Sequence, residues 1–425
     1  MNKPPFAAAL LSSATLAAAL SLGLAGPAHS AEKSKNTVSR ELAKPLKAAQ
    51  EDEQKGRYRE AIDKLMQANA NPKKTPFDQH VINELLLYAY IKTKDYADAV
   101  KPMEATIDDG FTEPAQVQNR IRDLGVIYYQ LKNYDKAIQY GERAVKGGFG
   151  NDTTYTLVSQ AYYLKGDYKD AVRFTNNYVD QEVKNGGMPK EQQLQIVLNS
   201  CVKLSDQQCA SRTLERLVTY YPKPEYWQDL INTLYVTKEA ENNDADMLAI
   251  YELANDVGAL KRAQDYIEMA QLALEQGLPG EAQQVLEKGI AQNLFADQQS
   301  RQRSERLFEK AKKAAATDQA SLARQAQDAA AAATGDKDVA VGEAYLSYQK
   351  YDQAVEALRR GIMKDSLKNP ARAQLMLGMA ELKAGNKDAA LKAFHDVKAS
   401  DPVLQRLANL WTVHAREQGR TVASR

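Results

Sequence analysis

Along most of the chain, short runs of apolar residues at helical spacing alternate with short polar turns. The stretch from Leu124 to Val145 shows the pattern best. Leu124, Gly125 and Tyr128 form one apolar stripe, and Ala137 opens a second stripe after a polar turn. This spacing predicts two amphipathic helices joined as an αα-hairpin. A single hairpin leaves an apolar face uncovered, so it needs neighbours of the same kind.

The same turn followed by an alanine recurs along the chain. Successive copies are spaced by 38, 38, 34, 39, 72, 72 and 36 residues. Each gap of 72 residues has room for two units, so we expect weak copies near Met247 and Ala320 and about ten hairpins in all. The clear copies end at Ala61, Ala99, Ala137, Ala171, Ala210, Ala282, Ala354 and Ala390.

The period and the residues at fixed places resemble the tetratricopeptide repeat. Gly342 stands before Ala354 as Gly125 stands before Ala137, Gly378 stands likewise before Ala390, and a proline follows twelve residues after Ala390. The resemblance implies an all-α fold, an α-solenoid of helix-turn-helix hairpins forming a right-handed superhelix. The glycines and the anchor alanines are expected where two helices approach closely.

Breaks in the repeat suggest how the chain is divided. Residues 41–310 are predicted to form an N-terminal array and residues 336–416 a shorter C-terminal set of hairpins. Residues 311–335 are rich in Ala and Gln and are expected to form a helix or a hinge. Residues 31–40 are interpreted as a flexible lead-in and residues 417–425 as a disordered tail.

The first 30 residues have the features of an export signal. Lys3 precedes an apolar run over residues 6–24, and Gly26-Pro27 ends it. Small residues then precede Ala31, where we expect cleavage. An uncleaved membrane anchor is the alternative, because the run is nearly long enough to span a bilayer.

Net charge points to no class of charged partner. The whole chain has a formal charge of +1, and Lys3 is the one charged residue before Ala31, so the cleaved chain is neutral. Nucleic acid and anionic membrane surfaces are therefore not expected partners. The 22 tyrosines, against 8 phenylalanines, suit half-buried helix faces, because the ring packs while the hydroxyl stays wet.

The two cysteines, Cys201 and Cys209, flank a predicted hairpin turn. In an exported protein they are expected to form a disulfide, with two buried thiols as the alternative. His80, His395 and His414 each stand alone on a predicted helix and are interpreted as surface or cap residues. We therefore expect no catalytic constellation, metal site or cofactor, and no enzyme.

The resemblance also implies a binding surface, because the first helices of tetratricopeptide hairpins line a concave groove. This mixed aromatic and polar set suits an extended peptide or an amphipathic helix of a partner protein. Inter-repeat packing is the alternative role for its tyrosines. The groove residues are Glu84, Tyr88, Arg122, Val126, Tyr129, Gln160, Tyr163, Gln195 and Asn199.

The whole chain looks like periplasmic tetratricopeptide proteins of Gram-negative bacteria, notably at residues 39–45, 79–84, 217–227 and 334–338. Some of these proteins are described as candidate components of the TonB energy-transduction system. The resemblance implies a periplasmic scaffold for protein–protein interaction, with an envelope or TonB-type partner. The alternative is a carbohydrate-binding helper in envelope polysaccharide export, which exposed rings at Tyr226 and Trp227 would favour.

Overall fold

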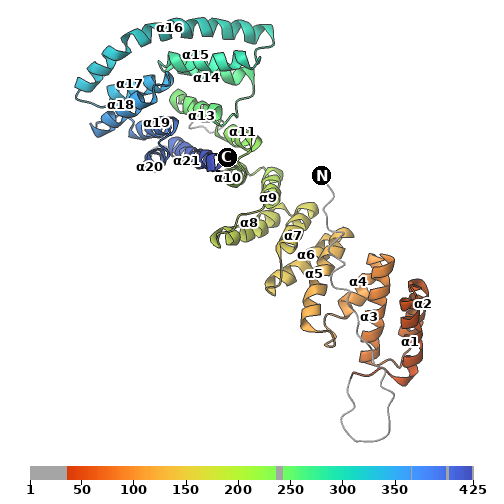
Figure 1. Cartoon of the computed structure of the whole chain (residues 1–425). Helices are drawn as coiled ribbons and strands as arrows, with labels where there is room; N and C mark the ends of the chain where they lie inside the picture. Colours follow the sequence, from red (N-terminus) through yellow and green to blue (C-terminus); the bar gives the residue numbers. More distant parts are fainter. Residues whose placement is uncertain (1–35, 236–242, 365, 399–401, 424–425) are drawn as a thin grey trace. The chain divides into compact units, whose positions relative to one another are not determined.

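A computed structural model describes residues 36–235, 243–364, 366–398 and 402–423. In these residues it contains twenty α-helices and no strand, which confirms the all-α fold class (Figure 1). The chain divides into two compact units, Met1–Ser205 and Asp206–Arg425, and each unit is described by itself. The predicted signal peptide and the cleavage position before Ala31 lie outside the described residues.

The N-terminal unit is a row of helical hairpins. Each helix packs against the next one along the chain, and the first helices also pack directly on one another in the pairs α1–α3, α5–α7 and α7–α9. Helices α3 and α5 are joined by the ion pair between Glu84 and Arg120, so the first helices follow one another along one side of the row. The helices are α1 (Arg40–Gln54), α2 (Tyr58–Asn69), α3 (Pro76–Thr93), α4 (Tyr96–Ala105), α5 (Pro114–Gln130), α6 (Tyr134–Lys146), α7 (Asp152–Lys165), α8 (Tyr168–Lys184) and α9 (Glu191–Lys203).

The turns inside the hairpins share one local structure. Second helices α2, α4, α6 and α8 all begin at a tyrosine, directly after the polar turn. Gly166 closes the turn before α8 with φ of 93°, a left-handed backbone conformation that glycine adopts without a steric penalty. The tyrosine ring then returns to the first helix, as in Tyr168, whose ring centroid lies 5.4 Å from that of Tyr163.

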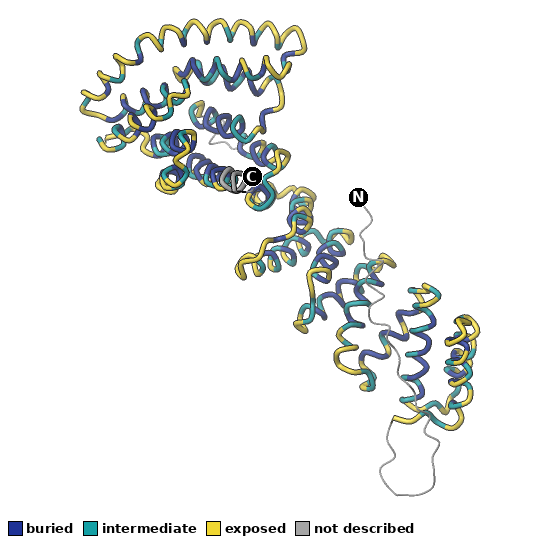
Figure 2. Tube along the Cα trace, viewed as in Figure 1, coloured by how far each residue is buried: buried dark blue, intermediate teal, exposed yellow. Residues whose placement is uncertain are grey.

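The anchor alanines lie where the repeat places them. Seven of the eight are fully buried in the second helix of a hairpin. Ala210, from the degenerate copy, is the exception and is half-buried. Figure 2 shows that buried and exposed residues alternate along the helices of each unit. Small side chains at these positions let the paired helices approach closely, so the interior of each unit is built from helix faces of one repeating design.

In the C-terminal unit, the last helix packs against the first. Helix α21 packs against α10, α13, α19 and α20, and Nε of Arg406 lies 2.9 Å from Oε1 of Glu215 in α10. The helices are α10 (Gln207–Tyr220), α11 (Pro224–Tyr235), α13 (Asp244–Asp256), α14 (Ala263–Glu275), α15 (Pro279–Ala291), α16 (Gln298–Ala331), α17 (Asp336–Ser347), α18 (Tyr351–Met363), α19 (Pro370–Lys383), α20 (Lys387–His395) and α21 (Pro402–Ala423).

Helix α16 corrects the repeat count. It runs for 34 residues without interruption, so the weak hairpin expected near Ala320 does not form. Ala, Gln, Lys and Arg are strong helix formers, and no Gly or Pro lies between residues 298 and 331 to end the helix. The predicted boundary at residue 310 falls inside this helix, and residues 311–331 are helical. Helix α21 likewise continues to Ala423, so residues 417–423 are helical rather than a disordered tail.

None of the helices in the described ranges is both long enough and apolar enough to cross a membrane. Residues 36–39 precede α1 without helical structure, which is the described part of the expected lead-in.

Candidate functional site

The nine predicted groove residues all lie on first helices of the N-terminal unit. Glu84 and Tyr88 are in α3, Arg122, Val126 and Tyr129 in α5, Gln160 and Tyr163 in α7, and Gln195 and Asn199 in α9. None of the nine is buried, and the two residues of α9 are exposed. The structure thus leaves them accessible on the first helices, and their role in binding stays a prediction.

Glu84 and Tyr88 line an apolar pocket of about 340 Å³ at the start of this face. Its walls come from α1, α3 and the connection that leads into α5. The Phe77 and Phe111 rings meet edge to face with centroids 5.4 Å apart, and the His80 ring lies 5.4 Å from Phe111. The pocket is therefore a small aromatic recess between two hairpins, and no local sequence pattern marks Phe77, His80 or Phe111 as its lining.

Two ion pairs engage charged groups at this pocket. Nη1 of Arg120 lies 2.6 Å from Oε1 of Glu84, and its Nη2 donates a 2.8 Å hydrogen bond to Oε2, so the pairing is bidentate. Nδ1 of His80 lies 2.8 Å from Oδ2 of Asp109. His80 is thus not the isolated residue that the sequence suggested. Since these charges are already satisfied, an incoming group meets mainly apolar surface.

Glu53, on α1, is the exception among these polar groups. It is 6% exposed, and its Oε1 is buried without a hydrogen-bond partner. Burial raises the pKa of Glu53 to about 8, because removal from water disfavours the charged form. The side chain is therefore a neutral acid at pH 7 and adds hydrogen-bonding capacity, without charge, to the pocket.

The middle of the face contains a second, more polar recess. Arg122 and Val126 line a cavity of about 310 Å³ with residues of α6 and α7. Nη1 of Arg122 donates a 2.8 Å hydrogen bond to the carbonyl of Phe149. Burial raises the pKa of the neighbouring Asp123 to about 6, partly opposed by Arg122. Arg122 thus holds the connection after α6 in place, which limits its freedom to bind a partner.

Two groove tyrosines have structural contacts of their own. The Tyr129 hydroxyl donates a 3.0 Å hydrogen bond to Oε1 of Gln160, and its ring lies 6.0 Å from that of Tyr134. Tyr163 makes the equivalent ring contact with Tyr168 in the next hairpin. Both rings keep part of their surface accessible. The two roles foreseen for these tyrosines, packing and binding, are therefore compatible.

Further tyrosines explain the abundance of this residue. The hydroxyls of Tyr128 and Tyr140 each donate a 2.7 Å hydrogen bond to Oε1 of Glu104, and Tyr162 bonds Glu142 in the same way. Burial alone would raise the pKa of Glu104, but the two hydroxyls and Lys136 lower it below its ordinary value. These carboxylate–tyrosine contacts fasten one repeat to the next and leave no open site.

The remaining sequence candidates have defined positions. Trp227 is 2% exposed and Tyr226 is half-buried, so the aromatic turn before α11 is mainly a packing element. Cys201 is fully buried in α9, and Cys209 lies in the first turn of α10. Formation of the Cys201–Cys209 bond in the exported protein stays a prediction. Within the described ranges, no three His, Cys, Asp or Glu side chains gather in a way that suits a metal ion.

Comparison with known proteins agrees with the hairpin pattern. Residues 123–146, the hairpin of α5 and α6, match the family model of the tetratricopeptide repeat. No curated protein matches the chain. The match covers one repeat, and the other hairpins are assigned to the same design by their register and anchor alanines. Arrays of such repeats form extended surfaces that serve as scaffolds for protein–protein interaction, generally without enzymatic activity.

Solved tetratricopeptide structures share a weak overall likeness with the chain. The TPR2AB domain of yeast Sti1, solved in complex with pHSP90, is 15% identical over 71% of this chain and 99% of that chain, with a TM-score of 0.25. A tetratricopeptide protein from Parabacteroides merdae is 12% identical over 78% and 98%, with a TM-score of 0.28. The P58(IPK) TPR domain is 10% identical over 89% and 99%, with a TM-score of 0.23. At these TM-scores the likeness carries no argument about function.

Proposed function

We propose that the protein is an exported scaffold that binds a segment of a partner protein along the first helices α3, α5, α7 and α9. The observation that carries this proposal is the aromatic pocket of about 340 Å³ on that face. Its ion pairs are internal, and its rings remain partly accessible. An apolar side chain of the partner would gain burial there without leaving a charge unpaired.

The remaining groove residues offer shallower contacts along the same face. Tyr129 and Tyr163 stand one repeat apart and present partly accessible rings, while Gln195 and Asn199 continue the face as exposed amides. An extended or helical segment that inserts one apolar anchor and lies across these side chains matches that distribution. The mechanism is passive: a preformed helical surface holds the segment without a chemical step.

The location we propose is the periplasm, after cleavage before Ala31. This rests on the signal-peptide pattern of residues 1–30 and on the likeness to periplasmic tetratricopeptide proteins. A TonB-type or other envelope component is the partner class that this likeness suggests. The carbohydrate-binding alternative loses its main support, because Trp227 is buried and cannot stack on a sugar.

Photo-crosslinking in the native host tests the proposal. A crosslinking residue replaces Tyr129 in one strain and Gln195 in another, and adducts are identified from intact cells. The matched control is Gln139, which is exposed on the second helix α6. We expect adducts with one envelope protein at Tyr129 and Gln195 and none at Gln139.

Three outcomes would oppose different parts of the proposal. Adducts that form equally at Gln139 would show that the first helices are not the binding face. Adducts spread over many exported proteins would point to a chaperone-like role in place of a dedicated partner. A fractionation of the same cells, with the protein recovered in the cytoplasm, would contradict the proposed location.

A further inference from the structure

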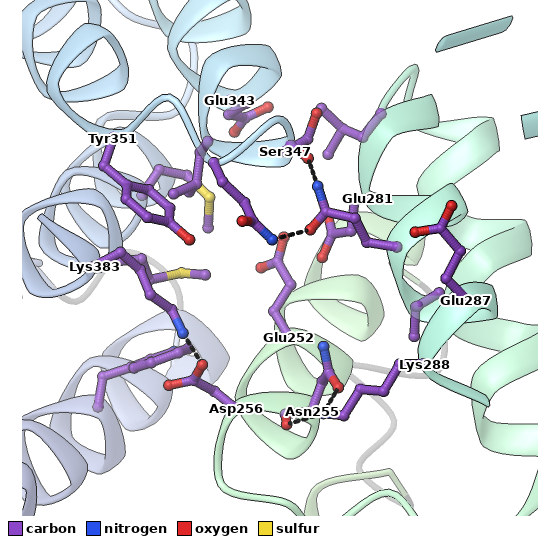
Figure 3. A pocket seen from close by; sticks show the side chains of 18 of the residues that line it. Glu252, Asn255, Asp256, Glu281, Glu287, Lys288, Glu343, Ser347, Tyr351 and Lys383 are labelled. Carbon is purple, nitrogen blue, oxygen red and sulfur yellow. Dashed lines mark hydrogen bonds and ion pairs between the residues drawn. The ribbon is translucent and has the colours of Figure 1, made fainter. Parts of the chain in front are cut away.

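The C-terminal unit contains a solvent-open cavity that the proposed groove does not use. It has a volume of about 640 Å³ and lies between α13, α15, α17 and α19, with Trp411 of α21 in its lining (Figure 3). This volume is within the range of about 300–1,000 Å³ that small-molecule sites occupy. All of its lining residues belong to residues 206–425, so the cavity is complete within one unit.

The charges on the cavity wall do not balance. Five carboxylates line it, those of Glu252, Asp256, Glu281, Glu287 and Glu343, and only two lysines do. Lys383 is paired with Asp256, and Nζ of Lys288 donates a 2.6 Å hydrogen bond to Oδ1 of Asn255. The cations of the wall are therefore already engaged, one with a carboxylate and one with an amide.

Behind the wall, Arg372 supplies one further cation. Its Nε lies 2.8 Å from Oε1 of Glu343, and its Nη1 donates to the carbonyl of Ala245. Glu252 and Glu281 form no ion pair in the described part of the chain. Arg372 acts on them only as a nearby charge.

Glu252 is the most confined of these groups. It is 7% exposed, and its Oε2 is buried without a hydrogen-bond partner. In Figure 3 it points from α13 toward Glu281 on α15. Burial is the main cause that raises the pKa of Glu252 well above its ordinary value, and the negative charge of Glu281 adds to this effect. Burial also raises the pKa of Glu281 to about 7. Two adjacent buried carboxyls retain a proton because ionising both would bring two negative charges together away from water.

We propose that this cavity binds an organic cation, an ammonium or guanidinium group on an aliphatic stem, whose charge the adjacent Glu252 and Glu281 carboxyls balance by releasing the proton that they hold. The buried, unpartnered oxygen of Glu252 supplies an acceptor for the N–H donors of such a group. Leu278, Val285, Met376 and Met379 supply apolar wall for the stem. A bare metal ion is not the ligand that this arrangement suits, because no three ligating side chains converge within the described ranges.

Two sources carry this chemistry: a free diamine, or a lysine or arginine side chain of a partner protein. The test uses the full exported chain and isothermal titration calorimetry with 1,5-diaminopentane and, separately, Nα-acetyl-lysine methylamide. The uncharged probe 1,5-pentanediol has the same carbon chain and serves as the ligand control. We expect at least one amine to bind and the diol not to bind.

Glu252→Gln removes a carboxyl that can ionise against the cation while keeping the shape, so binding of the amine should weaken by about tenfold or more. The matched control is Glu305→Gln, which changes an exposed carboxylate of α16 that lies outside the cavity and should leave binding unchanged. Circular dichroism shows whether each variant is folded, and Glu281→Gln provides a second variant should Glu252→Gln unfold. Binding of the diamine alone assigns the free amine, and binding of the lysine derivative alone assigns a partner side chain.

Failure of both amines to bind overturns the inference, and so does equal binding by Glu252→Gln and the unchanged protein. These outcomes are independent of the groove hypothesis, because the crosslinking positions and the cavity lie in different units. If one of these two proposals fails, the other is therefore unaffected.

Discussion

The hydroxyl of Tyr129 donates a 3.0 Å hydrogen bond to Oε1 of Gln160, which joins α5 to α7 across one repeat. Both residues belong to the predicted binding face. A residue that fastens two repeats can still contact a partner with its free surface, but its substitution then affects folding and binding together. Experiments on this face therefore have to separate the two effects.

Tyr129→Phe removes the hydroxyl and keeps the ring, so we expect a loss of about 0.5–1.5 kcal/mol in the free energy of unfolding. Urea denaturation followed by circular dichroism measures it. Tyr163→Phe is the control, because Tyr163 occupies the same place one repeat later and its hydroxyl has no hydrogen-bond partner in the described residues. A loss of equal size in both variants would contradict the assigned role of the Tyr129–Gln160 bond.

Gly342 and Gly125 occupy equivalent repeat positions, each twelve residues before an anchor alanine, but their surroundings differ. A Cβ added at Gly342 would lie 2.6 Å from Cγ of Leu358, whereas one added at Gly125 would lie 3.6 Å from its nearest neighbour. Gly342→Ala should therefore destabilise the protein by about 1–3 kcal/mol through overpacking.

Gly125→Ala should be neutral or stabilising by up to about 1 kcal/mol, because alanine favours the helix and meets only ordinary contacts. Differential scanning calorimetry of the two variants makes the comparison. Similar shifts in Tm for both would show that the close approach at Gly342 is relieved by movement of α18. Both glycines lie where two helices approach each other, but the approach is closer at Gly342.

The buried Glu53 should make stability depend on pH. Its pKa is about 8 in the folded chain against an ordinary value of 4.5, so between these values the folded chain keeps a proton that the unfolded chain has lost. Stability from this group is therefore full below about pH 4.5 and falls as pH rises through 8. Glu53→Gln should be more stable than the unchanged protein by about 1–3 kcal/mol at pH 8 and nearly equal at pH 5.

Chemical denaturation at pH 5, 6.5 and 8 measures this trend. Glu60→Gln, at an exposed position of α2, controls for the change in net charge and should alter the free energy of unfolding little. A stability difference between Glu53→Gln and the unchanged protein that is the same at every pH would contradict the assigned neutral state of Glu53.

A Cys201–Cys209 disulfide closes a short loop and should stabilise the exported protein by roughly 2–3 kcal/mol in the chain-entropy model. Reduction should lower the Tm of the unchanged protein and have no effect on Cys209→Ala. Alkylation of the denatured protein, read by mass spectrometry, counts the thiols directly. Two modified thiols without reductant would end this prediction.

The hairpin design is the part of the fold that local sequence predicts best. An alanine after a polar turn recurs in register, and seven of the eight anchors are fully buried because each repeat meets its neighbours in the same way. The failure near Ala320 has an equally local cause. The repeat period predicted a hairpin there, but an unbroken run of helix formers without Gly or Pro forms one long helix, α16.

The groove residues were predictable as a row because helical spacing fixes which side chains share the first-helix face. The pocket at its start was not, because it needs Phe111 from a connection to meet Phe77 and His80 on α3, and Glu53 from another hairpin. Single residues of ordinary type carry no local signal for such a meeting. A neutral, buried Glu53 is likewise invisible in sequence, since burial alone sets its protonation.

By itself, the sequence determined the helices, their pairing into hairpins and the face on which the accessible aromatic and polar residues lie. These features follow from hydrophobic periodicity and turn chemistry, which act over a few residues. The tertiary structure decided which carboxylates lose their water and their partners, as Glu252 does against Glu281 and as Glu53 does on α1. That outcome depends on helices far apart in the chain closing around a side chain, because the energy of a charge is set by its surroundings in space.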